Sequence, residues 1–152
     1  MKEKGALVPL LLGVPLGILL GVGVFTFGYA RGYSYMTDDP NACRNCHVMR
    51  EQYEGWQKSS HRTAAVCNDC HTPPGLFAKY FTKALNGYHH SLAFTSGRFP
   101  DDILITGRNQ RVAEESCLKC HEDITSGIRS AHRPGDRSVS CVSCHRNVGH
   151  AY

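Results

Sequence analysis

The chain has 152 residues and a formal net charge of +4, from 17 lysines and arginines against 13 acidic residues. This length is enough for one small domain. The basic side chains form no run and do not alternate with aromatic ones, as they do in many nucleic-acid-binding proteins. We therefore expect no nucleic-acid partner.

The first predicted element is a membrane-spanning helix over residues 5–30, which carry no formal charge. About 20 apolar residues are enough to cross the hydrocarbon core of a bilayer, and membrane helices tolerate prolines such as Pro9 and Pro15. The alternative is a cleaved signal peptide, with the small residues at 28–30 as the cleavage site. The apolar run is longer than the roughly 7 to 15 residues of a signal-peptide core. We therefore expect residues 1–31 to be an uncleaved membrane anchor.

Four copies of Cys-x-x-Cys-His follow this segment and use all eight cysteines. The copies are Cys43, Cys46 and His47; Cys67, Cys70 and His71; Cys117, Cys120 and His121; and Cys141, Cys144 and His145. This motif is typical of covalent haem c attachment, in which the two thiols form thioethers to the porphyrin. The adjacent histidine is placed to bind the iron from one side. The sequence therefore predicts a domain over residues 32–152 that holds four haem c groups.

Other uses of paired cysteines explain the pattern less well. Two pairs can close a tetrahedral zinc site, a single pair can act in thiol–disulfide exchange, and exported chains can carry a disulfide framework. None of these gives a reason for a histidine after every pair. We therefore interpret the motifs as haem sites.

The haem motifs also indicate where the domain lies, because haem c is attached outside the bacterial cytoplasmic membrane. Lys2 and Lys4, against Glu3, add a small positive bias before the span, and Arg31 opposes it beyond the span. We expect a single pass through the inner membrane, with the N-terminus cytoplasmic and the haem domain periplasmic. A domain of this size has a thin apolar core, so the haems must supply much of its buried surface.

The spacing of the motifs indicates an internal repeat. The second motif follows the first by 24 residues, and the fourth follows the third by the same 24. This spacing predicts two dihaem modules, at about residues 40–74 and about 114–150.

Between the modules, residues 75–95 predict an amphipathic helix. Its apolar face carries Phe77, Tyr80, Phe81, Ala84, Leu85, Tyr88 and Leu92, and another face carries Lys79, Lys83, Asn86 and His90. Residues 96–110 predict a loop, and Gly127 together with residues 134–136 predicts irregular backbone in the second module. No alternating pattern supports a sheet. The expected fold class is mainly α with much irregular structure: one transmembrane helix followed by a small multihaem cytochrome c domain.

Each iron that only transfers electrons needs a further axial ligand. The donors outside the motif histidines are His61, His89, His90, His132, His150 and Met49. We expect His61 and His150 to be distal ligands. His150 is too close in sequence to His145 to serve the same haem. His90 is a candidate ligand or near-haem group, whereas packing is the more natural role for His89. For Met49, iron ligation and simple packing both remain open.

Several segments resemble a known family, the NapC/NirT membrane-anchored tetrahaem quinol dehydrogenases, and within it the small subunits of cytochrome c nitrite reductase complexes. The segments are residues 43–49, 59–61, 83–94 and 144–150. The resemblance implies that Met49 replaces His47 as the ligand of the first haem. It also places Lys83 at a quinol pocket beside that haem. Where some members have an aspartate, this chain has His90, so the other side of the first haem is open, weakly ligated or histidine-ligated. The second haem is implied to take a lysine of the catalytic partner.

The function implied by the resemblance is oxidation of menaquinol at the membrane surface. Lys83, with His90 or a nearby carboxylate, would assist proton release. The electrons would pass to a periplasmic pentahaem catalytic subunit, held in a stable hetero-oligomer, that reduces nitrite to ammonium. Two alternatives stay open: a general quinol-oxidising donor that serves several reductases, and a tethered cytochrome with its own reductase site.

Overall fold

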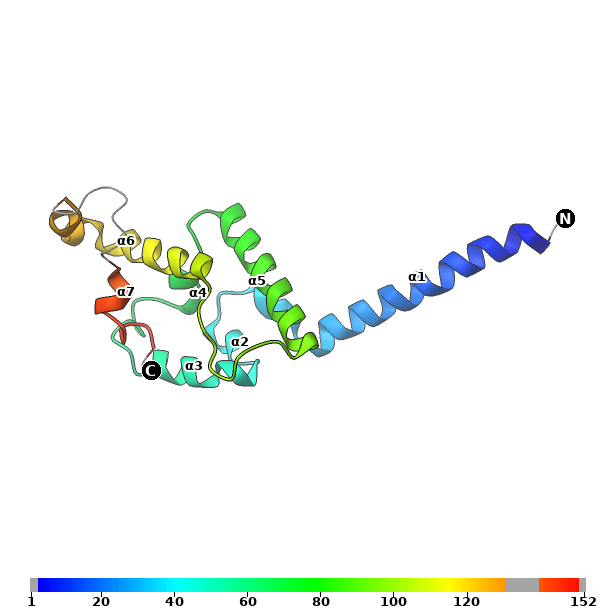
Figure 1. Cartoon of the computed structure of the whole chain (residues 1–152), viewed down its shortest axis with the longest axis horizontal. Helices are drawn as coiled ribbons and strands as arrows, with labels where there is room; N and C mark the ends of the chain where they lie inside the picture. Colours follow the sequence, from blue (N-terminus) through cyan, green and yellow to red (C-terminus); the bar gives the residue numbers. More distant parts are fainter. Residues whose placement is uncertain (1–2, 131–139, 151–152) are drawn as a thin grey trace. The chain divides into compact units, whose positions relative to one another are not determined.

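The computed structural model describes the backbone of residues 3–130 and 140–150 and the side chains of residues 7–128 and 140–150 (Figure 1). The chain divides into two compact units, Met1–Ser34 and Tyr35–Tyr152. Three features of the sequence predictions lie outside the described side chains: the basic residues before the span, His132, and residues 134–136.

The first unit is dominated by helix α1, which spans Glu3–Tyr29. Its stretch Leu7–Tyr29 has 23 residues, a mean hydropathy of 2.4 and no buried part. At 1.5 Å per residue such a helix is about 35 Å long, which exceeds the roughly 30 Å of a hydrocarbon core. Pro9 and Pro15 lie inside the helix without ending it. By length and composition, α1 can therefore cross a membrane. The short 3-10 helix η1, Gly32–Met36, follows it.

The second unit begins with short helices that carry the first two motifs. These are α2 (Pro40–Cys43), the 3-10 helix η2 (His47–Met49), α3 (Arg50–Gln57) and α4 (Cys67–His71). Asp39 starts α2, because its carboxylate accepts the backbone N–H of Asn41 at 2.9 Å and Pro40 occupies the first helical position. In the same way, the carboxylate of Asp69 accepts the N–H of Val66 at 2.8 Å at the start of α4. Local capping thus allows helices of only one turn to persist.

Helix α5, Leu76–Ser96, lies one residue from the predicted range and ends at Gly97, whose left-handed φ of 66° closes the helix. Helix α6, Gly107–Ser130, corrects the sequence analysis in two places. It begins inside the predicted loop 96–110 and continues through Gly127. The stretch before Gly127 is rich in Arg, Gln, Glu, Ala and Leu, which are strong helix formers, and a single glycine costs a helix only about 1 kcal/mol.

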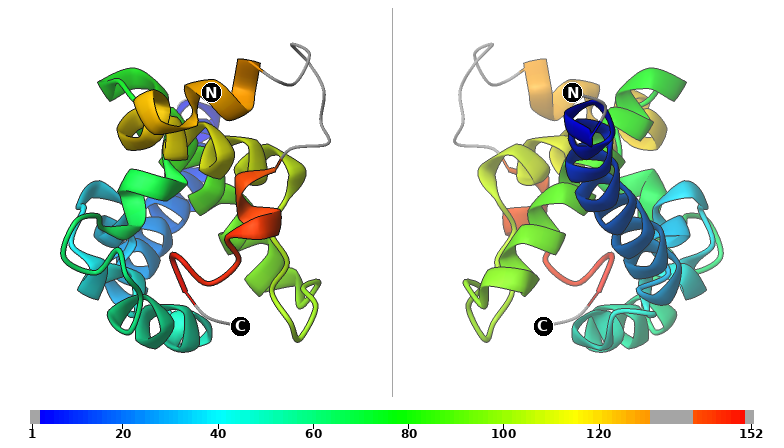
Figure 2. Two further views of the ribbon diagram at one scale, coloured as in Figure 1. Left: turned by 90° about the vertical axis from the view of Figure 1, so that its left-hand side faces the viewer. Right: turned by 90° about the vertical axis from the view of Figure 1, so that its right-hand side faces the viewer.

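The last helix, α7 (Cys141–Cys144), carries the fourth motif. Both α4 and α7 contact α6, and Figure 2 shows α7 beside α6. Among residues 3–130 and 140–150 there is no strand. The predicted fold class, mainly α with much irregular structure, is therefore confirmed.

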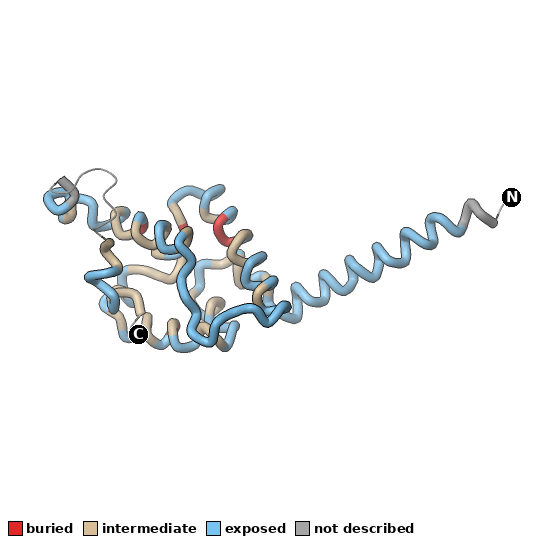
Figure 3. The backbone as a smooth tube through the Cα atoms, in the orientation of Figure 1, coloured by how far each residue is buried: buried red, intermediate tan, exposed pale blue. Residues whose placement is uncertain are grey.

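Few residues of the second unit are buried, as Figure 3 shows. Within the described side chains, Tyr53 is the only hydrophobic residue that is buried, while the buried polar residues include Lys83. Phe77, on the apolar row of α5, is 90% exposed. Apolar side chains alone therefore do not hold this unit together, as its small size predicted.

Candidate functional site

The four haem-attachment motifs all lie on or beside helical turns. The first runs from the end of α2 to the start of η2, the second forms α4, the third lies within α6, and the fourth forms α7 with His145 directly after it. In the three motifs that lie on one helical turn, cysteines three residues apart point to the same side, which presents two thiols together. No two of the eight cysteines are joined by a disulfide, which leaves every pair available for attachment to haem.

Successive motifs lie next to each other. A hydrogen bond with Cys67 lowers the pKa of the Cys43 thiol to about 7, so these two sulfur atoms are neighbours. Cys117 and Cys141 are hydrogen-bond partners in the same way. The second and third motifs are linked by Lys119, whose Nζ donates to the backbone oxygens of Asp69 at 2.8 Å and Thr72 at 2.7 Å. The four attachment sites therefore form a continuous series.

The same cysteines do not form a zinc site. The described residues include every cysteine, and no three His, Cys, Asp or Glu side chains among them gather as metal ligands. A tetrahedral zinc site needs four donors around one ion. Haem attachment needs only two neighbouring thiols and an adjacent imidazole at each motif, and this donor set is present four times.

Two histidine pairs have the spacing of axial ligands. The ring centres of His61 and His121 are 6.1 Å apart, and those of His71 and His150 are 6.3 Å apart. Two imidazoles whose nitrogens each lie about 2.0 Å from one shared metal ion have ring centres about 6 Å apart. The spacing of both pairs thus fits one iron between the two rings.

The hydrogen bonding of His61 supports this interpretation. Its Nδ1 lies 3.1 Å from the backbone oxygen of Val148. A carbonyl oxygen can only accept, so Nδ1 donates to it and Nε2 is the nitrogen that remains to bind iron. Metal-bound histidines are commonly fixed by such a bond on the other ring nitrogen. His61 is therefore oriented as a donor through Nε2.

The two histidine pairs connect the halves of the domain crosswise. His61 comes from the first half and meets the third motif, whereas His150 comes from the second half and meets the second motif. The resemblance implies a lysine of the partner for the second haem. The ring of His150, which lies beside His71, is a second candidate for the same place.

The first motif has different surroundings. The His47 ring faces Phe94 edge-on, with ring centres 6.4 Å apart, and Phe94 stacks on Phe99 at 5.8 Å. Met49, half-buried, ends η2 directly before α3. His47 thus contacts an aromatic side chain, in contrast to the imidazole neighbours of His71 and His121.

Lys83 is held by the segment that precedes α2. Its Nζ lies 2.9 Å from Oδ1 of Asp38 and donates to the backbone oxygen of Thr37 at 2.7 Å. The side chain of Lys83 is 6% exposed. Lys79, one turn earlier on α5, pairs with the other oxygen of the same carboxylate. Hydrogen bonds from Lys79 and then Lys83 lower the pKa of Asp38 to about 2.

A second polar pair lies further along α5. The Tyr35 hydroxyl is 2.7 Å from Nδ1 of His90. Burial, more than the neighbouring charge of His89, lowers the pKa of His90 and favours its neutral form. Lys83, His90 and Phe94 recur at helical spacing, so they share one side of α5. The candidate substrate residues therefore lie on the same helix face as the aromatic contact to His47.

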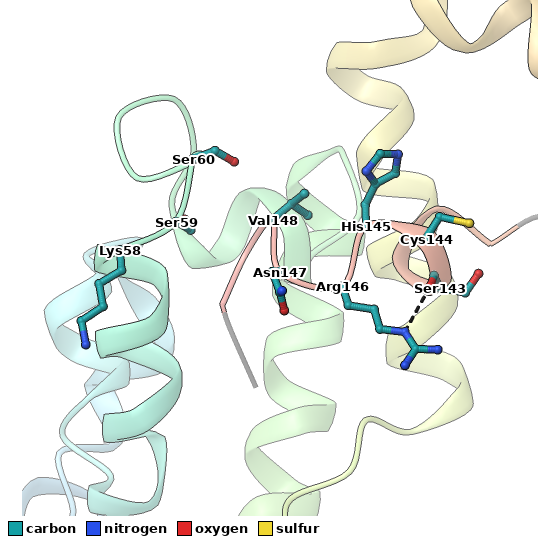
Figure 4. A pocket seen from close by; sticks show the side chains of 9 residues that line it. All are labelled: Lys58, Ser59, Ser60, Ser143, Cys144, His145, Arg146, Asn147 and Val148. Carbon is teal, nitrogen blue, oxygen red and sulfur yellow. Dashed lines mark hydrogen bonds between the residues drawn. The ribbon is translucent and has the colours of Figure 1, made fainter.

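An open cleft of about 550 Å³ lies beside the fourth motif. Residues 58–60 form one side and residues 143–148, including His145, the other (Figure 4). Nε of Arg146 donates to the backbone oxygen of Ser143, three residues earlier, at 3.1 Å. The cleft brings the segment before His61 next to the last motif.

Sequence reasoning missed three residues at these sites: Tyr35, Asp38 and Glu114. Oxygens of Glu114 accept the N–H groups of Cys141 at 2.7 Å and Val142 at 3.3 Å, which ties α6 to the fourth motif. For Asp38 a signal existed, since an acidic pair, Asp38 and Asp39, directly precedes the first motif. No local pattern points to Tyr35 or Glu114.

The fold and the site together define a class of protein: a helical c-type cytochrome with one apolar N-terminal helix and four attachment motifs. Residues 6–152 match the NapC/NirT cytochrome c family, N-terminal region, and the chain belongs to this family. It is therefore a haem c protein anchored in a membrane by a single span. The family prediction from the sequence is confirmed.

Two characterised relatives and one solved structure are similar over most of the chain. The cytochrome c-type protein NrfH of Wolinella succinogenes is 38% identical, over 90% of this chain and 82% of its own. The cytochrome c nitrite reductase subunit NrfH of Nitratidesulfovibrio vulgaris is 34% identical, over 91% and 80%. A chain in the crystal structure of the cytochrome c nitrite reductase NrfHA complex bound to the HQNO inhibitor is 30% identical, with a TM-score of 0.64 over 91% of this chain and 88% of that chain.

Proposed function

We propose that this chain oxidises menaquinol and passes the electrons to a periplasmic nitrite reductase catalytic subunit, which reduces nitrite to ammonium. The chain is the quinol dehydrogenase and electron-transfer subunit of such a complex, and it does not reduce nitrite itself. The relatives named NrfH and the NrfHA complex support the partner. The observation that carries the substrate site is the row of Lys83 and His90 on α5, beside the first motif.

The two side chains have different roles in this proposal. An ammonium group that is paired with a carboxylate offers N–H donors and no lone pair, so Lys83 orients and polarises a quinol oxygen. A neutral imidazole has a lone pair, so His90 accepts a proton as quinol is oxidised. Proton acceptance thus falls to His90, while the Asp38 carboxylate, with its low pKa, only holds Lys83 in place.

The cysteines of the four motifs would hold four haem c groups, which accept and pass on single electrons. His61 with His121 and His71 with His150 are the proposed axial pairs, and His145 binds on one side of the last iron. For the first site we propose Met49 in place of His47, because the His47 ring is turned to Phe94. Neighbouring Cys43 and Cys67, and Cys117 and Cys141, support two dihaem modules.

We further propose that residues 1–31 anchor the chain in the bacterial inner membrane, with the N-terminus cytoplasmic and residues 32–152 periplasmic. The span leaves only a few residues before the second unit begins at Tyr35. This short link supports the proposal that a quinol dissolved in the bilayer is the substrate.

The role of Lys83 is tested by replacing it in the haem-loaded complex. We expect Lys83→Met to lower menaquinol-dependent nitrite reduction about 100-fold, as the loss of one preorganised donor typically does, with haem content unchanged. Lys79→Met is the matched control, because Lys79 pairs with the same carboxylate from a more exposed position. We expect less than about a twofold change there. Equal rates in wild type and Lys83→Met would contradict the assignment.

The partner is tested separately by purifying the full chain from membranes and identifying by mass what accompanies it. A stable complex with a multihaem nitrite reductase is the expected result. A solitary cytochrome that reduces several reductases equally well would instead favour a general donor. Nitrite turnover by the isolated chain would favour a reductase site of its own.

A further inference from the structure

We propose that Tyr35 is a positioning residue for quinol oxidation: its hydroxyl oxygen accepts the Nδ1–H of His90 and thereby turns Nε2 towards the substrate. This inference rests on the proposed function, because it assigns the proton-accepting atom of that site. Neither the sequence motifs nor the haem ligands account for Tyr35.

The geometry fixes the His90 ring through one of its two nitrogens. The Tyr35 oxygen lies 2.7 Å from Nδ1, a short and direct hydrogen bond, and the two rings are tilted by 46° with centres 6.1 Å apart. With Nδ1 committed to this bond, only Nε2 remains for a substrate hydroxyl. An imidazole without such a partner could rotate or present either nitrogen.

Tyr35 is itself held in place by the backbone of α5. A side-chain carbon built on Gly87 would lie 3.6 Å from three atoms of the Tyr35 ring, so the ring packs directly against the helix at this glycine. Gly87 is one turn before His90. The phenol ring is thus supported by the same helix that carries the imidazole, which keeps the distance between the two groups short.

The hydroxyl oxygen of Tyr35 keeps lone pairs with which it can accept the Nδ1–H of His90. Burial, as the largest cause, raises the pKa of Tyr35, so the phenol stays uncharged. Charges on Cys46 and Cys43 act in the same direction and disappear when these sulfurs become thioethers. Their influence places Tyr35 close to the first motif.

The proton balance of the step is simple. Neutral His90 has its proton on Nδ1, shared with the Tyr35 oxygen, and a lone pair on Nε2. A quinol hydroxyl transfers its proton to Nε2 as the quinol loses one electron to the haem c that the first motif would hold, and the second proton and electron follow in the same way. The resulting imidazolium keeps the Nδ1–H bond to Tyr35, and it returns to the neutral form by releasing the Nε2 proton to water.

The test uses the full, haem-loaded chain in its complex and menadiol as the electron donor. The variants are Tyr35→Phe, His90→Gln and the double variant, with Tyr33→Phe as the matched control. Tyr33 lies on the same 3-10 helix but is 53% exposed. We expect Tyr35→Phe to lower kcat about tenfold, the loss of about one hydrogen bond, with KM changed less than twofold. Tyr33→Phe should match wild type.

The double variant shows whether Tyr35 acts only by positioning His90 or also has a role of its own in quinol oxidation. If Tyr35 acts only through His90, the double variant is no slower than His90→Gln alone. Additive losses, or wild-type kcat in Tyr35→Phe, would overturn the inference. A changed haem absorption spectrum in His90→Gln would also overturn it, because His90 would then bind iron. A wild-type complex that does not oxidise menadiol, yet is reduced by another donor, would count against the proposed function itself.

Discussion

The two motif pairs share one plan and differ in their surroundings. In both pairs the motifs are 24 residues apart, and their first cysteines are neighbours. Around the first pair, the polar side chains of Asp38, Lys83 and His90 gather beside the first motif. Around the second pair, polar groups hydrogen-bond within the domain. Glu114, for example, accepts a hydrogen bond from the backbone of α7. The proposed substrate residues therefore lie beside the first pair, whereas the polar contacts beside the second pair hold one helix to another.

The halves are nevertheless in contact, because the ring of His61 lies beside His121 and the ring of His150 lies beside His71. The proposed axial pairing of these rings makes the clearest prediction. Replacing His61 or His150 by Gln should leave one iron with a single protein ligand, and one of the four haems should change from low spin to high spin. The haem absorption and EPR spectra of the purified chain measure this change.

His89→Gln is the control for this prediction. The His89 ring contacts Tyr88, at 5.5 Å between centres, and is not paired with another imidazole. Its replacement should leave the spectrum unchanged. If His150→Gln also left all haems low-spin, the crosswise pairing would be wrong, and the partner lysine implied by the family would become the better ligand for the second haem.

The second prediction concerns the structural half. Glu114→Ala removes a carboxylate that accepts from Ser140, Cys141 and Val142. Hydrogen bonds to a charged group contribute about 1.5 to 3 kcal/mol, so the thermal midpoint should fall by about 5 to 10 °C in a chain of this size. The neighbouring Glu115 is exposed, and Glu115→Ala should change the midpoint by no more than about 1 °C. Equal shifts would contradict the role of Glu114.

The smallest expected effect is a pH dependence in the substrate half. The pKa of Asp38 is about 2 in the folded chain, below its ordinary value of about 3.9. A lowered carboxyl pKa stabilises the fold above the ordinary value, and this contribution is lost as the pH falls towards 2. Asp38→Asn should therefore be less stable than wild type at neutral pH by a few degrees or less, since Asp38 is 48% exposed.

Thermal midpoints measured from pH 7 down to pH 2 test this expectation. The difference between wild type and Asp38→Asn should shrink as the pH falls below about 4. Asp101→Asn serves as the control, because Asp101 is an exposed loop residue. A difference that stays constant with pH would mean that the charge of Asp38 does not matter.

Much of the fold could be predicted because its signals are local. The apolar run of α1, the three-and-four spacing of α5 and the Cys-x-x-Cys-His motifs each lie within one short segment. The start of α6 was missed because its residues have helix propensity without a clear apolar stripe. The prediction of irregular backbone at Gly127 was wrong, because one glycine inside a long helix lowers the stability of the helix only slightly.

The candidate site was only partly accessible to such reasoning. Lys83 and His90 were found through the resemblance of residues 83–94 to a family. Their partners Asp38 and Tyr35 lie 45 and 55 residues away in sequence. A hydrogen bond across such a distance leaves no periodic or local signal, so sequence patterns could not pair these residues.

The sequence by itself determined which chemical groups this protein carries. These are four haem-attachment motifs, one apolar span and several histidines outside the motifs. Covalent motifs can be read in sequence because the thiols and the histidine must be neighbours along the chain. Only the tertiary structure decided which ring meets which, placing His150 beside His71 and Tyr35 beside His90. Axial and hydrogen-bond partners act through space, and their identity depends on how α4, α5 and α6 bring distant segments together.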